Sequence, residues 1–245
     1  MSFSGQRVVV IGASAGVGEA TARAFAAEGA QVIITGRVKE RLDAAASRIG
    51  GDVSSRVVDA TDGAAVSSFF GSLDRLDHLV LAASPGAIGS GPFADLAEPA
   101  LRAAFDGKLF AYVRVLQAAL PKLRADGSVT FISAASARAA YPGSTGLAAV
   151  NGAVEAIVRP LAVELAPLRV NAVSPGVIDT GWWDVLPDDQ RKAFFGSVAA
   201  TSPVGRVGAP EDVADAVRYL AGAGFVTGTV LECAGGATLT VGATA

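Results

Sequence analysis

The sequence predicts an α/β fold in which a doubly wound, parallel seven-stranded sheet carries helices on both faces. Seven short apolar runs alternate with longer amphipathic segments from one end of the chain to the other. Each run is apolar throughout, which is typical of strands that are covered on both faces. Strand–helix–strand units repeated at this spacing need right-handed crossovers, and such crossovers make the sheet parallel. The 245 residues fit a single domain that spans 1–245.

The expected strands and helices follow one another along the whole chain. We expect strands at residues 8–11, 32–35, 56–60, 78–83, 128–133, 169–173 and 229–233. The helices expected between them cover residues 19–28, 40–49, 64–73, 101–123, 148–165 and 211–221. The helices at 101–123 and 148–165 are apolar on more than one face, which predicts that a partner covers them.

Composition and charge exclude several classes of protein. Hydrophobic residues make up 51% of the chain and the mean hydropathy is +0.45, which is too apolar for a disordered chain. A net charge of −3 and a pI near 5.2 leave no basic face for nucleic acid. The N-terminus lacks a signal-peptide pattern and no apolar run approaches roughly 18 residues. We therefore expect a cytoplasmic protein without a membrane span.

The single cysteine and the single histidine limit the available chemistry. Cys233 has no partner for an internal disulfide, and His78 alone cannot build a histidine metal site, so no metal is expected. His78 begins an expected strand, where a structural role is the simpler interpretation. Cys233 lies in the last expected strand and is expected to be a small buried apolar side chain.

A glycine-rich turn follows the first expected strand and precedes the first helix. It reads Gly12-Ala13-Ser14-Ala15-Gly16-Val17-Gly18. Gly12 permits a sharp exit from the strand, Gly16 lets a pyrophosphate approach the backbone, and Gly18 allows close packing of helix against sheet. The free amides and positive dipole end of the helix favour the phosphate charge. An ordinary glycine turn is the alternative, but the context predicts dinucleotide binding by a Rossmann fold.

The end of the second expected strand indicates which nicotinamide cofactor fits. An acidic side chain there bonds the ribose 2′-hydroxyl, whereas an arginine accommodates a 2′-phosphate. The chain reads Thr35-Gly36-Arg37-Val38-Lys39 and holds no carboxylate before Glu40. Arg37 can offer a planar fork to a phosphate, although it could also merely solvate the start of a helix. We expect NADP(H) in preference to NAD(H).

Five features in chain order resemble the short-chain dehydrogenase/reductase family in its single-domain form, and they span essentially the whole chain. The glycine turn has that family's GxxxGxG spacing, and Asp59 matches the aspartate that contacts the adenine. The segment 171–180 resembles the family segment that borders the nicotinamide. The pairs Thr227-Gly228 and Gly235-Gly236 match its C-terminal TG and GG pairs. The resemblance implies further cofactor contacts from Ala83, Pro175, Gly176, Val177, Ile178 and Thr180.

The positions that carry catalysis in this family hold other residues here. Family members reduce a carbonyl with a tyrosine that gives up its proton, a lysine one helical turn later, a serine and an asparagine. The lysine lowers the phenol pKa from about 10, which requires both groups on one helix face. No lysine occurs between Lys122 and Lys192, so no register restores the pair. In the family order asparagine, serine, tyrosine, lysine, the positions carry Lys108, Ala134, Leu147 and Asn151.

Other groups could replace the missing acid. Tyr141, with Arg138 nearby, is the strongest candidate, although a loop pair lacks the fixed geometry of a helix face; alternatively its ring packs and its hydroxyl is exposed. Ser133 lies at the exit of the fifth expected strand. Lys108 could place a cation in the pocket, but a lysine on a long helix is expected to be solvated.

Assembly and cover of the site are also implied by the resemblance. The helices expected at 101–123 and 148–165 form a four-helix contact between subunits in the family, so we expect a homodimer or, more strongly, a tetramer. Trp182 and Trp183 follow Thr180 in the segment that covers the substrate. They predict either an apolar lid or an oligomer contact.

Three functions remain open at this point. The first is an NADP(H)-dependent oxidoreductase that acts on carbonyl or alcohol substrates and has rerouted its proton transfer. The second is a non-catalytic, cofactor-binding sensor or silent subunit, which the substituted positions favour. The third is a redox-neutral lyase, for which the intact glycine turn and the missing serine–tyrosine–arginine set make the weakest case.

Overall fold

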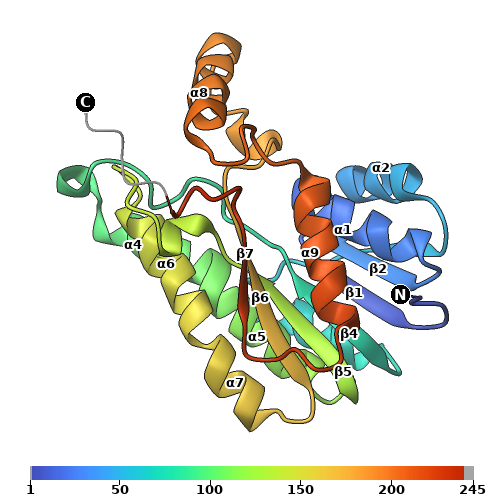
Figure 1. Cartoon of the computed structure of the whole chain (residues 1–245). Coiled ribbons are helices and arrows are strands. Elements are labelled where there is room, and N and C mark those ends of the chain that lie inside the picture. Colours follow the sequence, from blue (N-terminus) through green and yellow to red (C-terminus); the bar gives the residue numbers. More distant parts are fainter. Residues whose placement is uncertain (1, 240–245) are drawn as a thin grey trace.

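The computed structural model describes residues 2–239 and contains a seven-stranded parallel sheet (Figure 1). The strand order is β3-β2-β1-β4-β5-β6-β7, so the chain winds outward from β1 in one direction and from β4 in the other. The sequence prediction of a doubly wound Rossmann fold is confirmed. The strands are β1 Arg7–Ile11, β2 Gln31–Gly36, β3 Val53–Val57, β4 Leu76–Leu81, β5 Leu123–Ile132, β6 Arg169–Pro175 and β7 Val230–Cys233.

Helices cover both faces of the sheet, as expected. One apolar layer joins the sheet to α1, α2 and α9, and the other joins it to α3, α5, α6 and α7 (Figure 1). Phe25 of α1 is fully buried in the first layer and Tyr112 of α5 in the second. The helices are α1 Gly16–Ala27, α2 Lys39–Ile49, α3 Gly63–Gly71, α4 Glu98–Phe105, α5 Ala111–Ala119, α6 Thr145–Ala156, α7 Val158–Glu164, α8 Asp188–Thr201 and α9 Pro210–Gly222.

The third strand lies three residues earlier than predicted. β3 pairs with β2 from Val53 to Val57, whereas residues 58–60 have left the sheet. β3 is an edge strand and carries Ser54 and Ser55, which made it less apolar than its neighbours. The prediction followed the apolar pair Val57-Val58 and therefore placed the strand too close to its carboxyl end.

The helix predicted over 101–123 is not one helix. α4 ends at Phe105, a π-helical turn covers Asp106–Phe110, and α5 follows. Gly107 in that turn lies so close to Pro85 that a Cβ there would be 2.7 Å from the Pro85 Cβ. Pro121 has no N–H to continue the ladder, so the helical stretch stops before it and β5 begins at Leu123.

The helix predicted over 148–165 begins earlier and divides in two. α6 starts at Thr145, and Pro160 in the first turn of α7 cannot donate to the carbonyl of Ala156, where α6 ends. By length and composition alone, Thr145–Glu164 could cross a membrane, with a mean hydropathy of 1.3. Within the fold, Val154 and Val158 of this stretch are fully buried in one apolar layer of the core, while most of the stretch is not buried.

The helix α8 was not predicted from the sequence. It projects from the end of the molecule where the strands finish (Figure 1), and none of its residues is buried. A helix that buries no face shows no apolar stripe, so its periodicity is weak. Pro187 at its N-cap, followed by Asp188 and Asp189, was the available signal.

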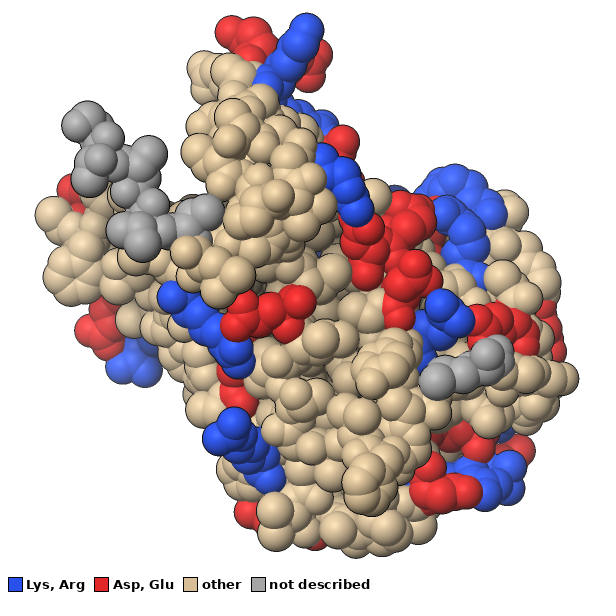
Figure 2. Space-filling model, viewed as in Figure 1, with Lys and Arg blue, Asp and Glu red and all other residues tan. Residues whose placement is uncertain are grey.

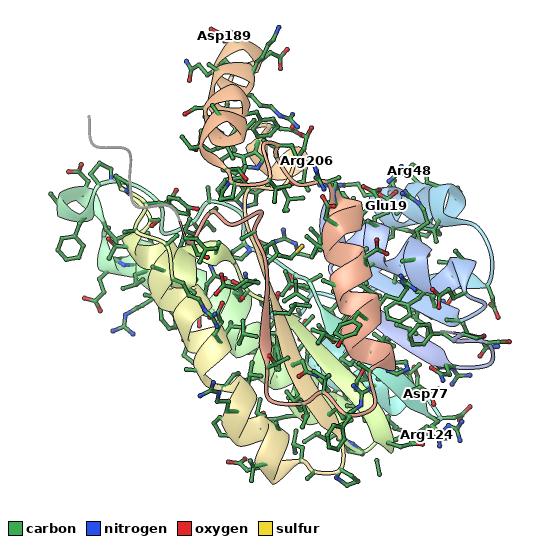
Figure 3. The ribbon with its side chains drawn as sticks, viewed as in Figure 1. Glu19, Arg48, Asp77, Arg124, Asp189 and Arg206 are labelled. Carbon is green, nitrogen blue, oxygen red and sulfur yellow. The ribbon has the colours of Figure 1, made fainter. Side chains whose placement is uncertain are left out.

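Ion pairs fasten the helices of one face to each other. Arg48 of α2 donates to both carboxylate oxygens of Glu19 on α1, at 2.9 and 2.7 Å, and holds the pKa of Glu19 below its usual value (Figure 3). Arg23 contributes a further bond at 2.9 Å. On the face shown in Figure 2, basic and acidic side chains lie beside one another instead of gathering by sign.

His78 has the structural role that the sequence indicated. Its ring is buried against Phe3 and Phe25, with Nδ1 2.8 Å from Ser128 Oγ and Nε2 2.7 Å from Gln6 Oε1. Burial lowers the pKa of His78 to about 4. Between this value and the unfolded pKa near 6.5, the unfolded chain binds a proton that the folded chain does not, so stability falls as the pH falls.

We expect the free energy of unfolding of the wild type to fall by about 3 kcal/mol between pH 7 and pH 4 through His78 alone. The variant His78→Asn keeps a polar side chain but cannot titrate, so this part of the pH dependence should disappear. Urea unfolding at four pH values would measure both proteins. Parallel curves for wild type and variant would contradict the assignment.

Candidate cofactor-binding and active site

A cavity of about 1330 Å³ lies at the carboxyl ends of the strands. Its lining begins at Ile11, where β1 ends, and includes Cys233, where β7 ends. In open α/β sheets this is the edge where ligands bind, beside the point where the strand order reverses. Every residue predicted to hold the cofactor lines this cavity: Gly12, Ser14, Ala15, Gly16, Val17, Gly18, Arg37, Asp59, Ala83, Pro175, Gly176, Val177, Ile178 and Thr180.

The glycine turn is built on close backbone approaches. Gly12 has a φ of +84°, and a Cβ on it would lie 2.6 Å from the backbone N and Cα of Ala83. A Cβ on Gly18 would lie 2.2 Å from the carbonyl oxygen of Gly12. Gly16 has a φ of +59° and faces the side chain of Thr180, 3.3 Å from the position of a Cβ. A side chain on Gly12 or Gly18 would therefore displace backbone, whereas one on Gly16 would need an unfavourable φ and a small shift of the Thr180 side chain.

The N-terminus of α1 is left open toward the cavity. Its N-cap residue, Ala15, has no side-chain acceptor, and Ser14, Ala15, Gly16 and Val17 all line the cavity. The first amides of a helix have no partner within the helix, and together with the helix dipole they attract anions. The turn therefore fits the pyrophosphate of a dinucleotide.

Two arginines stand at the same end of the cavity. Arg37 and Arg41 are exposed, and neither guanidinium has a hydrogen bond or ion pair with any residue in 2–239. Asp59 accepts from the N and Oγ1 of Thr61 at 2.9 and 2.8 Å. These bonds, aided by the charge of Arg37, hold the pKa of Asp59 below its usual value. The pair of free guanidinium groups is the arrangement that a phosphate needs.

Lys108 is buried, contrary to the expectation that it is solvated. The π-helical turn directs it inward, and it lines the cavity with only 7% of its surface exposed. Its Nζ donates to Asn151 Oδ1 at 2.6 Å and to the carbonyl oxygen of Ser133 at 3.3 Å. Burial lowers the pKa of Lys108 to about 8, and the charge of Glu155 opposes this only in part.

Asn151 is held by hydrogen bonds on both sides of its amide. Its Nδ2 donates to the carbonyl oxygen of Leu147 at 2.9 Å and to Ser136 Oγ at 3.2 Å. Because the NH₂ group faces two oxygens, the Oδ1 atom is the one presented to Lys108. The lysine and the asparagine, 43 residues apart, form one buried pair.

The side chain of Ser133 belongs to a second chain of hydrogen bonds. Its hydroxyl donates to Glu155 Oε1 at 2.8 Å, and Arg138 Nε donates to Glu155 Oε2 at 2.9 Å. Arg138 also pairs with Glu232 of β7, which accepts from Thr238. The network therefore links the exit of β5 to the segment after β7.

The comparisons with known proteins agree with this geometry. A family model described as "Enoyl-(Acyl carrier protein) reductase" matches residues 12–238. A short-chain dehydrogenase/reductase of Stachybotrys chlorohalonatus is 32% identical, over 97% of this chain and 99% of that protein. A 3-oxoacyl-[acyl-carrier-protein] reductase of Thermotoga maritima is 31% identical, over 96% and 99%. The chain belongs to the short-chain dehydrogenase/reductase family. Among solved structures, a small-chain dehydrogenase in complex with NADPH has a TM-score of 0.83, 30% identity, and coverage of 96% and 99%.

The three side chains that the sequence put forward as substitute acids, Ser133, Tyr141 and Lys108, line the same cavity, whereas Arg138 is outside its lining. Leu147 and Ala134 have no proton to give, although both lie beside Lys108 and Asn151 in the lining. Tyr141 is 41% exposed. Burial of part of its ring raises the pKa of its phenol, and no cation within 2–239 pairs with it. One cavity thus holds the three proposed substitutes, which differ in burial and hydrogen bonding. Ser133 is buried and bonded to Glu155, Tyr141 is partly exposed, and Lys108 is buried and bonded to Asn151.

An aromatic cover lies over part of the cavity. Trp182 and Trp183 pack edge to face with centroids 4.5 Å apart, and Trp183 packs on Phe194 of α8 at 4.7 Å. Trp182, Trp183 and Phe194 all line the cavity. The arrangement agrees with an apolar lid, and an oligomer contact for the two tryptophans stays untested.

Sequence reasoning missed several residues of this site. Arg41 lies four residues after Arg37, in the first turn of α2, and was detectable as a second cation there. Glu155 and Phe194 had no local signal, because their roles come from contacts made across the fold. Cys233 is half-buried beside the carbonyl oxygen of Asp212, at 3.4 Å, so it is less enclosed than expected.

We expect Gly12→Ala to destabilise the protein and to abolish cofactor binding. The variant combines an unfavourable φ with a backbone clash, together costing about 2–5 kcal/mol. Gly5→Ala is the matched control, because Gly5 has a φ of +73° and nothing within 4 Å of its Cβ position. Urea unfolding should show a loss at least twice as large for Gly12→Ala. Equal losses would mean that the approach to Ala83 is not the constraint.

Proposed function

We propose that this protein is an NADP(H)-dependent oxidoreductase that interconverts a carbonyl compound and the corresponding alcohol. One observation carries the proposal: a single cavity joins an open dinucleotide-binding turn to a buried ammonium under an apolar cover. Membership of the family and the NADPH-bound neighbour support the same function. A sensor would need the turn but has no use for a desolvated cation.

Different residues of the chain would bind different parts of NADP(H). The amides at the start of α1 would bind the pyrophosphate, and Arg37 with Arg41 would bind the 2′-phosphate. Asp59 would lie beside the adenine, and the segment from Pro175 to Thr180 would border the nicotinamide. Bound NADPH would supply the hydride for the carbonyl carbon.

A non-catalytic role is the second candidate. Ala134 and Leu147 favour it, because neither side chain can hydrogen-bond or protonate a carbonyl oxygen. In that case the protein would bind NADP(H) as a sensor or as the silent subunit of a mixed oligomer. A redox-neutral lyase stays the weakest candidate, because the open turn keeps the dinucleotide site.

The two candidates differ in turnover. We expect purified protein to oxidise NADPH in the presence of apolar ketones and aldehydes at a rate above that of buffer. A hydride donor and a carbonyl held together react faster through proximity alone. Absorbance at the reduced-nicotinamide band, over a panel of carbonyl compounds, would measure this rate. Tight NADPH binding without any turnover would favour the non-catalytic role.

We expect the variant Arg37→Asp to prefer NADH. It removes a charge-assisted hydrogen bond, worth about 1.5–3 kcal/mol, and places a carboxylate near the phosphate. The dissociation constant for NADPH should rise about ten- to a hundredfold, while that for NADH falls or stays unchanged. Arg56→Asp is the control, because Arg56 is an exposed arginine outside the cavity lining. Equal losses for the two variants would contradict NADP(H) selectivity through Arg37.

Assembly into a homodimer or tetramer remains a proposal. It is supported by an apolar surface on the helices expected to pair, where Phe110 is 50% exposed and Val163 is 78% exposed. A small hollow of about 150 Å³ lies between α5 and α7 and is lined almost entirely by apolar side chains. A second copy would remove this surface from water. Location in the cytoplasm likewise stays a prediction.

A further inference from the structure

Among the residues that the structure describes, Lys108 is a buried cation without a counter-ion. Two acceptors face its Nζ, the Asn151 Oδ1 atom and the Ser133 carbonyl oxygen, and both are neutral. An ammonium group has three donors, and within residues 2–239 the third has no acceptor. A charge buried without an ion pair costs several kcal/mol. The fold therefore keeps an ammonium group with one unused donor buried at the wall of the cavity.

The charged groups around Lys108 are arranged so that none neutralises it. The negative charge of Glu155 on α6 acts on Lys108, but the two oxygens of that carboxylate accept hydrogen bonds from Ser133 and Arg138. Asp106 on the same π-helical turn makes no bond to it. Tyr112 of α5 donates its hydroxyl to the carbonyl of Ala83 at 2.7 Å, and burial raises the pKa of that phenol.

The two other groups proposed as substitutes are less suited to give a proton. The hydroxyl proton of Ser133 is committed to Glu155. Tyr141 lies in the loop before α6, where burial raises the pKa of its phenol, and no cation in residues 2–239 pairs with it. An effective acid has a pKa near the working pH. Of the three, Lys108 alone combines cavity exposure, a free donor and a lowered pKa of about 8.

We propose that Lys108 is the general acid of this oxidoreductase, binding and protonating the carbonyl oxygen of the substrate, and that Asn151 is the residue that positions its ammonium. The inference rests on the proposed function. In the reduction, the carbon–oxygen π bond breaks as the carbon receives the hydride. The oxygen takes the proton from Nζ and becomes the alcohol hydroxyl, and the neutral amine recovers a proton from water. In alcohol oxidation the same amine accepts the proton.

The amide of Asn151 suits this role better than a carboxylate would. A neutral acceptor orients the ammonium without stabilising its charge strongly, so the proton remains easy to transfer. The bonds from Nδ2 to Leu147 and Ser136 prevent the amide from turning its NH₂ group toward Lys108. An aspartate at this place would form an ion pair with Lys108 and raise its pKa.

The side chains on the same cavity wall indicate the kind of carbonyl compound. Leu147 lies one helical turn before Asn151, and Val150 precedes it directly. The aromatic cover adds Trp182 and Phe194. A ketone or aldehyde with apolar substituents would bury them against these side chains and leave only its oxygen for Lys108.

The first test uses Lys108→Met, which keeps an unbranched side chain of nearly the same length without the charge. We expect turnover to fall by about a hundredfold to ten-thousandfold, the usual effect of general acid–base catalysis. The dissociation constant of NADPH should change by less than about threefold, a factor that corresponds to under 1 kcal/mol. Lys122→Met, at the opposite end of β5, is the control and should match the wild type. Unchanged turnover in Lys108→Met, or loss of NADPH affinity with unchanged turnover, would overturn the proposal.

The second test follows the proton and does not depend on Lys108→Met being folded. In the wild type, kcat/KM for ketone reduction should fall above about pH 8, as Lys108 loses its proton. Asn151→Asp should move this decline to higher pH. Competitive acetylation of the apo protein, read by mass spectrometry, should give the same shift in the reactivity of Lys108, with Lys122 as internal reference. A decline that does not move in Asn151→Asp would overturn the assignment.

The outcomes separate this inference from the proposed function. A wild-type protein that oxidises no NADPH with any carbonyl compound would refute the oxidoreductase proposal and the acid together. If the wild type turns over substrate but no faster than Lys108→Met, the oxidoreductase proposal remains and only the role of Lys108 as the general acid is refuted.

Discussion

The close approach of the β1 exit to the β4 exit is the constraint on which the site depends. Gly12 passes the backbone of Ala83 at a distance that leaves no room for a side chain. The contact joins the segments that follow β1 and β4, which are paired in the sheet, and it places the start of α1 at the carboxyl ends of these two strands. The open amides of α1 and the interior of the cavity are therefore fixed relative to each other by backbone alone, independently of any side chain that performs chemistry.

The dinucleotide half of the site was predictable because its signals are local. The glycine turn, Arg37 and the segment 175–180 each lie directly after a strand, and in a parallel sheet all such ends meet at one edge. The strands themselves were visible as apolar runs. Where the prediction failed, as for β3 and α8, the elements lie at an edge or outside the core and bury too little to carry a clear pattern.

The catalytic half could not be predicted in the same way. The position of Lys108 depends on a π-helical turn that nothing in the local sequence announces, apart from Gly107. Its partner, Asn151, comes from another helix, and its second acceptor is a backbone carbonyl. From the sequence, positions 108 and 151 were interpreted as two separate losses of a family catalytic residue. In the fold they are one contact, in which an ammonium and an amide face each other.

The loose attachment of α8 has a consequence for how molecules enter and leave. None of its residues is buried, and Arg191 ties it to Asp179 and Asp184 by ion pairs with side chains that are more than half exposed. Such pairs contribute about 0–1 kcal/mol and are screened by salt. Besides these pairs, α8 is held by the packing of Phe194 and Phe195 on Trp183, so we expect its displacement to cost less free energy than unfolding a strand of the sheet. Because Phe194 and Val198 of α8 line the cavity, access to this part of the cavity should vary with ionic strength more than the geometry of the glycine turn, which backbone contacts hold.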